Sequence, residues 1–301
     1  MIQEAENSEP EERATALVAP PNQPSIERRR LAAELRGLRE GAKMTVEEAR
    51  TALGWSSGRL NHMEGGRHSV PDTSGFRALL DLYGVTDPLQ REALEALRRE
   101  AKARPWWKDF DDVLTDGFLG WEERARRIFA FHPIVVPGLL QTPEYAAASA
   151  RASQARTEEE VERIVAARVE RQQRVLGKEG APEFRCVLDE AALLRLSAMP
   201  SELANAQLRH LVDMATSVNT VELLVLPISV GLHASLHGST VLLEYDDERD
   251  PPIVYLETRG HGTYVTGSAQ VADYRMALDA VTADALSKSA GIELIAGMIT
   301  E

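Results

Sequence analysis

Arg59 and Asn61 carry side chains that can each bind the flat edge of another molecule through two parallel hydrogen bonds. A guanidinium matches the two acceptors on the edge of guanine, and a carboxamide matches the donor and acceptor on the edge of adenine. Both residues stand in the segment MTVEEARTALGWSSGRLNHMEGGRHSVP, residues 44–71. We therefore take these two residues as the first candidates for contacts with the bases of a nucleic acid.

The same segment offers further groups for a phosphate or a base edge. Thr45 can cap a helix and present its hydroxyl or the adjacent N–H to a phosphate, and Glu48 follows at the spacing of a capping box. Arg67 follows a pair of glycines, where a loop would meet a phosphate backbone. The full set of expected DNA contacts is Thr45, Ser56, Ser57, Arg59, Asn61, His62 and Arg67.

Other roles stay open for several of these residues. Arg59 could bind a phosphate instead of a base, and His62 could be an ordinary solvated helix residue. Ser57 and Gly58 could serve only to let the helix approach its ligand closely.

Two short helices must position these side chains, and the spacing predicts them over 45–53 and 56–64. Gly54 allows the positive φ of a sharp turn between them, and Trp55, Leu60 and Met63 are spaced to fill a core under the second helix. Apolar residues at helical spacing predict three more helices around this pair. They cover residues 25–41, 73–83 and 88–103, so the module is all-α, and we expect Leu89, Ala93, Leu94 and Leu97 on the apolar side of the last helix.

The net charge of −13 on 301 residues argues against binding to nucleic acid. The distribution of the charge along the chain reverses that argument. Residues 25–70 hold nine basic and six acidic residues, which leaves −16 on the remainder. A mildly basic module on an acidic body suits a selective DNA-binding protein, because the body repels the polyanion. The alternative is that these arginines form only a solvated helix face.

The stretch LGWSSGRLNHMEGGRHSVP resembles the XRE-type (lambda-repressor-like) helix-turn-helix regulators, with their Leu-Gly, capping Ser, Leu-x-x-Met/Ile-Glu and later Gly-Arg and Pro. Two positions depart from that family. Val46 stands where the family usually has Gln, whose amide helps to hold the complex on DNA. Arg50 stands where a small residue is favoured at the helix crossing, although Ala49 is adjacent. The departures imply a rotated or looser first helix.

The resemblance continues toward the end of the chain. RPWWKDF, VVPGLLQTPEYA, VERQQRVL, LDEAALLR, AQLRHLVDMA, VELLVLPISVGLHASLHGSTVLLEY and IVYLET are similar to the C-terminal domain of actinobacterial WhiJ-like regulators. The resemblance implies a transcription factor of developmental or antibiotic-regulation type, often encoded beside a small partner protein. It implies no enzymatic activity and no cofactor.

The second part of the chain alternates helical and strand patterns. We expect helices and loops over 121–131, a long helix over 158–176, and strands over 184–189, 221–227, 240–245 and 252–257. Helices are expected near 190–196, 200–216, 269–286 and 287–298. The predicted fold is a helix-turn-helix bundle followed by an α/β (α+β) domain, divided into a disordered tail at 1–24, a DNA-binding domain at 25–85, a connecting helix at 86–105 and a sensing, dimerisation or partner-binding domain at 106–301.

Chemistry other than DNA binding finds little support in this second part. His233, His237 and His261 could hold zinc, but the glycine-flanked GLHASLHGS argues for a loop and brings no carboxylate. Cys186 lies in an apolar strand, where a thiol is inert. An aromatic-rich stretch could line an effector pocket or, more often, join two cores: Trp106, Trp107, Phe110, Trp121, Phe129 and Phe131.

These observations predict a DNA-binding transcription regulator that acts as a homodimer on a pseudo-palindromic operator in double-stranded DNA. The acidic second domain would dimerise and receive a small partner protein or a small-molecule effector. The alternative is an antitoxin-like protein that sequesters a small partner and autoregulates its operon; an enzyme with a DNA-binding appendage ranks below both. The chain shows no signal sequence and no run of 18 apolar residues, so we expect no metal, no membrane contact and a cytoplasmic, nucleoid-associated location.

Overall fold

The computed structural model describes residues 26–66, 71–110, 113, 118–153, 157–247, 250–257 and 262–300, with the side chain of Ser57 excepted. The predicted tail at 1–24 and the predicted contact residue Arg67 lie outside these ranges, as does His261. Within the described part of the chain, no helix combines the length and apolarity needed to cross a membrane.

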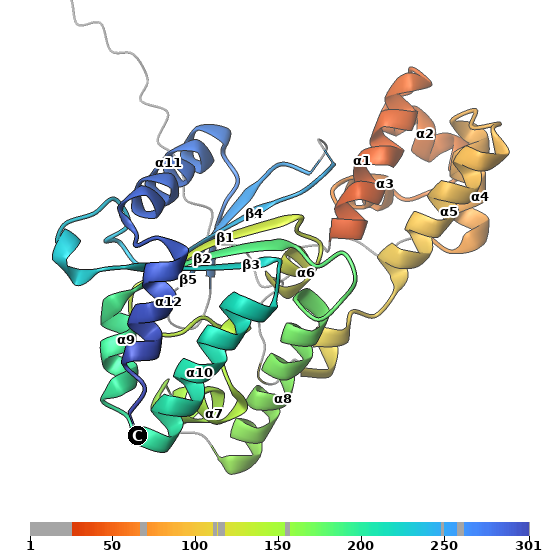
Figure 1. The fold of residues 1–301 in the computed structure, drawn as a ribbon. Coiled ribbons are helices and arrows are strands. Elements are labelled where there is room, and N and C mark those ends of the chain that lie inside the picture. The colour runs from red at the N-terminus through yellow and green to blue at the C-terminus, as the bar shows by residue number, and fades with distance from the viewer. Residues whose placement is uncertain are drawn as a thin grey trace, which may run out of the picture.

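The N-terminal helices form one bundle, drawn in red to yellow in Figure 1. Its apolar core includes Leu35, Leu60, Phe76 and Leu79, each with no exposed surface. Leu94 joins this core, but Leu89 is 76% exposed, so its predicted place on the apolar side is wrong. It lies in the first turn of its helix, away from the buried stripe. The helices are α1 (Ile26–Gly41), α2 (Val46–Leu53), α3 (Ser57–Glu64), α4 (Thr73–Leu82) and α5 (Pro88–Lys102).

The second part of the chain is built on a six-stranded sheet in the order β3-β2-β1-β4-β5-β6. β1, β2 and β3 are parallel, whereas β4 runs antiparallel to β1 and begins an antiparallel series with β5 and β6. This mixed sheet with helices confirms the predicted α+β class. The strands are β1 (Arg127–His132), β2 (Glu183–Asp189), β3 (Val221–Leu226), β4 (Thr240–Glu244), β5 (Ile253–Glu257) and β6 (Gly262–Val265).

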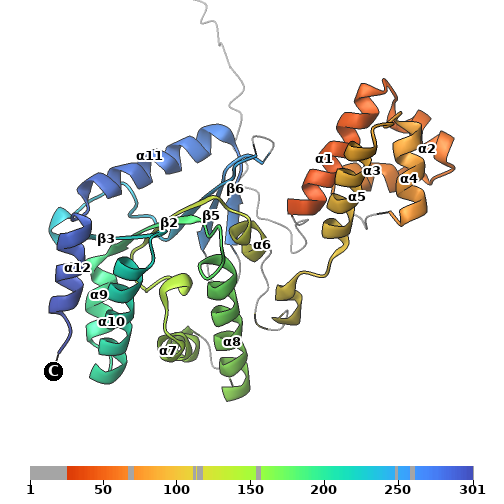
Figure 2. The same cartoon turned by 45° about the vertical axis from the view of Figure 1, so that its right-hand side comes forward.

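Helices cover both faces of this sheet, as Figures 1 and 2 show. α11 (Ser268–Asp284) packs on one face. The other face carries the larger apolar core, to which α9 (Glu190–Ser197), α10 (Ser201–Ser217) and α12 (Lys288–Gly297) contribute. The remaining elements are η1 (Trp106–Phe110), α6 (Phe118–Glu123), η2 (Gly138–Leu140), α7 (Pro143–Ser153), α8 (Glu158–Val175) and η3 (Ile228–Val230).

Two strands were not predicted. The range 121–131 was expected to hold helices and loops, but β1 begins at Arg127 and is one of the two central strands of the sheet. Phe131 packs on the α11 face and Ile128 on the other, so the strand is buried on both sides and lacks the alternation that marks a half-buried strand. β6 has four residues and begins with Gly262, so it is too short for a periodic signal.

The aromatic-rich stretch does not form one cluster. Trp121 lies in the core on one face of the sheet, and Phe131 lies in the core on the opposite face. Trp106, Trp107 and Phe110 meet edge to face in η1. The six residues therefore do not line a single effector pocket, because Phe129 and Phe131 lie on the face of the sheet opposite Trp121.

The first turn of α1 joins the helical bundle to the second domain (Figure 2). Ile26 is 1% exposed and packs into the core beneath the sheet. Arg29 lies 4.5 Å above the ring centroid of Trp121, and Arg30 donates from Nε to Asp250 at 2.5 Å. Arg124 completes this joint through an ion pair with Glu27 at 2.8 Å.

Candidate nucleic-acid interface

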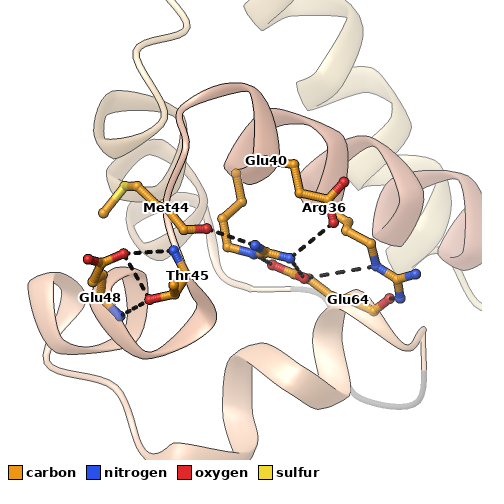
Figure 3. A network of polar contacts seen from close by, with 7 residues as sticks. Arg36, Glu40, Met44, Thr45, Glu48 and Glu64 are labelled. Carbon is orange, nitrogen blue, oxygen red and sulfur yellow. Dashed lines mark hydrogen bonds and ion pairs between the residues drawn. The ribbon is translucent and has the colours of Figure 1, made fainter.

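The start of α2 and the turn between α2 and α3 have the local structure that the sequence predicts. The hydroxyl of Thr45 accepts from the backbone N–H of Glu48, and the Glu48 carboxylate accepts from the N–H of Thr45 at 2.8 Å. This confirms the predicted capping box, visible in Figure 3. Gly54 has φ +66°, which confirms the predicted left-handed turn. Ser56 occupies the N-cap of α3, but its side chain makes no capping hydrogen bond.

A buried ion pair fixes the end of α3 against α1. The guanidinium of Arg39 donates to both carboxylate oxygens of Glu64, at 2.8 and 2.9 Å, and a third hydrogen bond reaches the carbonyl of Met44. Arg36 donates to the backbone carbonyl of Glu64 at 2.6 Å (Figure 3). Both partners of the Arg39–Glu64 pair are more than 90% buried. The pair therefore sets the angle at which α3 leaves the bundle.

The core side of α3 is fixed by Leu60 and Met63, which are 0% and 5% exposed. Successive residues of a helix are roughly 100° apart, so the side opposite this core is centred near Gly58 and His62. Arg59 and Asn61 flank that line, one on each side, and both are exposed. The surface of α3 opposite the core, which we call the α3 face, thus consists of the half-buried Gly58 and the exposed Arg59, Asn61 and His62.

Two local contacts organise the α3 face. The Arg59 guanidinium lies 4.2 Å from the ring centroid of Trp55, which directly precedes the N-cap of α3. The imidazole of His62 lies along the helix, since a Cβ built on Gly58 would stand 3.3 Å from its Cδ2. Gly58 therefore leaves room for the side chain of His62.

The two positions that depart from the XRE-type pattern pack as follows. Ala49 has no exposed surface and supplies the close packing in the bundle. Arg50 instead pairs with Glu47 and donates to the carbonyl of Trp55 at 3.3 Å. Val46 packs against the core, so it brings no polar group to the surface beside α3.

The positive charge available to a phosphate backbone is smaller than the count over residues 25–70 suggests. Arg28, Arg29, Arg30, Arg36 and Arg39 all lie on α1 and contact groups of the protein itself. The exposed Lys43 lies two residues before Thr45, the N-cap of α2, and adopts φ +55°. Lys43 stands in a turn with no motif, so the sequence does not single it out as a contact residue. Nor does the sequence predict the Arg39–Glu64 pair, whose members stand 25 residues apart.

In the second domain, the described residues give little support to a metal site or to a reactive thiol. Nε2 of His233 lies 3.7 Å from Asp189 Oδ2. Among the residues that the structure describes, no group of three or more His, Cys, Asp or Glu side chains could hold a metal ion. Cys186 is fully buried, and this burial raises the pKa of its thiol.

Two known families match the chain, one over the helical bundle and one over the second domain. A helix-turn-helix domain matches residues 30–94, from α1 into α5. A domain of unknown function, DUF5753, matches residues 115–297, which is more than half of the chain. Searches of curated proteins and of solved structures find no match. The chain belongs to the family that carries the domain of unknown function DUF5753, here preceded by a helix-turn-helix domain that points to a DNA-binding regulator.

Proposed function

We propose that this protein is a sequence-specific transcription regulator of the XRE-type, WhiJ-like group that binds double-stranded DNA through the α3 face. One observation carries the proposal: α3 is fixed to the bundle by Leu60, Met63 and Glu64 while its opposite side is exposed. That arrangement is the one by which the second helix of a helix-turn-helix enters the major groove. Arg59 and Asn61 then contact bases, with His62 between them.

The remaining predicted contact residues stand at the start of α2 and before or after α3 in the chain. Thr45 lies exposed at the start of α2, where N–H groups of the helix meet a phosphate. Ser56 and Ser57 begin α3, and Arg67 follows it. A single module contacts only one half-site, so we propose that a homodimer binds a pseudo-palindromic operator and that the second domain provides the dimer contact. Under this proposal the protein acts in the cytoplasm, at the nucleoid.

Replacing Arg59 with alanine tests the base-contact role. We expect the variant to lose about 1 to 3 kcal/mol of specific DNA affinity and to relax base preference at one position, because a bidentate contact to guanine disappears. The measurement is a binding titration on the operator, recovered first by genome-wide pull-down of bound DNA, and on operators changed at single positions. Arg185→Ala is the matched control, because Arg185 is a half-exposed arginine on β2 that pairs with Glu222. Unchanged affinity and footprint for Arg59→Ala would remove this role from Arg59.

The charge of Glu48 provides a second test, which asks whether the start of α2 faces DNA. Its carboxylate lies over the first turn of α2, and hydrogen bonds from the Thr45 backbone and hydroxyl lower its pKa, so it is an anion where a phosphate must approach. Glu48→Gln keeps a hydrogen-bond acceptor for the cap and removes the charge. We expect DNA affinity to rise several-fold at low salt, with the gain shrinking as salt is added.

The control for Glu48→Gln is Glu160→Gln. Glu160 forms the same capping box with Thr157 on α8 in the second domain. This change alters the charge and the cap equally but away from α3, so DNA affinity should not rise. An equal gain in both variants would mean that only net charge matters and that the start of α2 does not face DNA.

A further inference from the structure

The guanidinium of Arg59 is held at one place on the surface of the helical bundle. Its contact with the indole of Trp55, at 4.2 Å from the ring centroid, is attractive because the face of the ring is electron-rich. Arg59 is nevertheless exposed, and among the residues that the structure describes none accepts a hydrogen bond from it. The indole therefore restrains the guanidinium without using its hydrogen-bond donors.

The first turn of α4 lies against the same contact. A Cβ built on Gly75 would stand 3.3 Å from Cζ2 of Trp55 and 3.7 Å from Nη2 of Arg59. The same point lies 2.9 Å from Oδ1 of Asp72, the N-cap of α4. The indole, the guanidinium and the carboxylate thus converge on the small space beside Gly75.

This space explains why a glycine stands within α4. Alanine is the more favourable residue inside a helix, and Gly75 does not have the positive φ that would require glycine. A larger residue would take the space in which Trp55 approaches the helix. Glycine at this position therefore lets the indole lie against α4.

Asp72 adds an electrostatic restraint on the side of α4. The backbone N–H of Gly75 donates to its carboxylate at 2.8 Å. This hydrogen bond and, to a smaller extent, the positive charge of Arg59 lower the pKa of the carboxyl group. Asp72 is therefore an anion that attracts the Arg59 guanidinium toward α4.

We infer that Trp55, in the space left by Gly75, is a positioning residue that orients the Arg59 guanidinium for its contact with a base. The inference rests on the proposed function, since it concerns how the α3 face contacts DNA. An unrestrained arginine has many rotamers and loses that freedom when it binds. A guanidinium already held on an indole loses less on binding, and one orientation of its planar donors is favoured. A fixed orientation favours the two acceptors of guanine at one operator position.

The competing explanation is that the half-buried Trp55 only fills the core of the bundle. A double-mutant cycle separates the two explanations. Trp55→Leu removes the indole and keeps an apolar side chain, and DNA affinity is measured with Arg59 present and in the Arg59→Ala background. With Arg59 present, we expect specific affinity to fall about 2- to 10-fold, with relaxed preference at the operator position that Arg59→Ala relaxes. In the Arg59→Ala background, Trp55→Leu should cause no further loss.

Two further variants accompany the cycle. Trp55→Phe keeps an aromatic face for the guanidinium and should retain most of the base preference. Trp106→Leu is the matched control, because Arg174 lies 5.2 Å from the ring centroid of Trp106 in a similar contact away from α3. Its DNA affinity should equal that of the wild type. The inference is overturned if Trp55→Leu leaves base preference unchanged with Arg59 present, or if it causes the same loss in both backgrounds.

A measurement on the wild type decides the question should Trp55→Leu not fold. NMR relaxation of the Nε–Hε group reports how strongly an arginine side chain is restrained on the picosecond-to-nanosecond timescale. In the DNA-free protein we expect a higher order parameter for Arg59 than for Arg209, an exposed arginine on α10. Equal order parameters would overturn the inference.

The outcomes also separate this inference from the proposed function. An effect of Arg59→Ala on DNA binding that is not coupled to Trp55 removes only the positioning role and leaves the base contact in place. An Arg59→Ala variant that binds DNA as the wild type does removes the base contact itself, and the positioning role with it.

Discussion

Replacing Glu64 with alanine is expected to lower the free energy of unfolding of the helical bundle by about 3 to 5 kcal/mol, because it leaves the buried Arg39 guanidinium without its carboxylate. Arg39 cannot lose its proton to escape this cost, since a guanidinium stays charged in proteins. The measurement is urea unfolding of the full chain, followed by the helical circular dichroism signal. DNA binding should weaken in parallel, since the end of α3 loses its connection to α1.

Two comparisons separate buried charge from lost packing. The double variant Arg39→Met/Glu64→Leu replaces the pair by apolar side chains and should regain most of the stability that Glu64→Ala loses. Glu47→Ala removes the exposed partner of Arg50 and should leave stability nearly unchanged. A Glu64→Ala variant as stable as Glu47→Ala would mean that the pair does not hold α3 in place.

Local signals made the helix-turn-helix predictable from sequence. Each decisive feature lies within a few residues of its partner: the Thr45–Glu48 capping box, the left-handed Gly54, and the spacing of Leu60 and Met63. Such short-range patterns need no knowledge of the remaining chain. The same logic applies to the long helix predicted over 158–176, which corresponds to α8.

Long-range pairs were not predictable in this way. Arg30 bonds to Asp250, 220 residues later, and so a side chain counted as available to DNA is used inside the protein. β1 escaped recognition because burial on both faces removes the alternation that would identify it. The approach of Gly75 to Trp55 and Arg59 carried no motif either. The sequence singled out VPGLLQT, but only the fold brings Gln141 of that loop to Arg168 on α8.

The short helix α6 contacts both α8 and α1. Glu122 pairs with Arg171 of α8, and the preceding residue Trp121 lies under Arg29 of α1. The backbone carbonyl of Trp121 also accepts from the Tyr245 hydroxyl at 3.3 Å. α6 is therefore in direct contact with both α8 of the second domain and α1 of the helical bundle.

The second large effect is a loss of stability in mild acid that depends on His132. The ordinary pKa of histidine is 6.5, and in the folded protein burial and the charge of Arg171 lower the pKa of His132 to about 4. Below pH 6.5 the unfolded chain therefore binds a proton that the folded protein does not, and proton uptake favours unfolding. The stability that depends on a neutral His132 is therefore present at pH 7 and is lost as the pH falls toward about 4. Near pH 4.5 this loss lowers the free energy of unfolding by about 2 kcal/mol.

The measurement compares urea unfolding at neutral pH and near pH 4.5 for the wild type and for His132→Gln, in chloride buffers free of phosphate and carboxylate. Carboxylates titrate in both proteins, so the difference between them isolates His132, whose nearest charged influence is Arg171. We expect the variant to lose about 2 kcal/mol less than the wild type over this range. His237→Gln, at an exposed histidine of the same domain, is the control and should behave as the wild type. Parallel losses in wild type and His132→Gln would show that the imidazole is protonated in the folded protein and that its surroundings are more polar than the packing beside Arg171 implies.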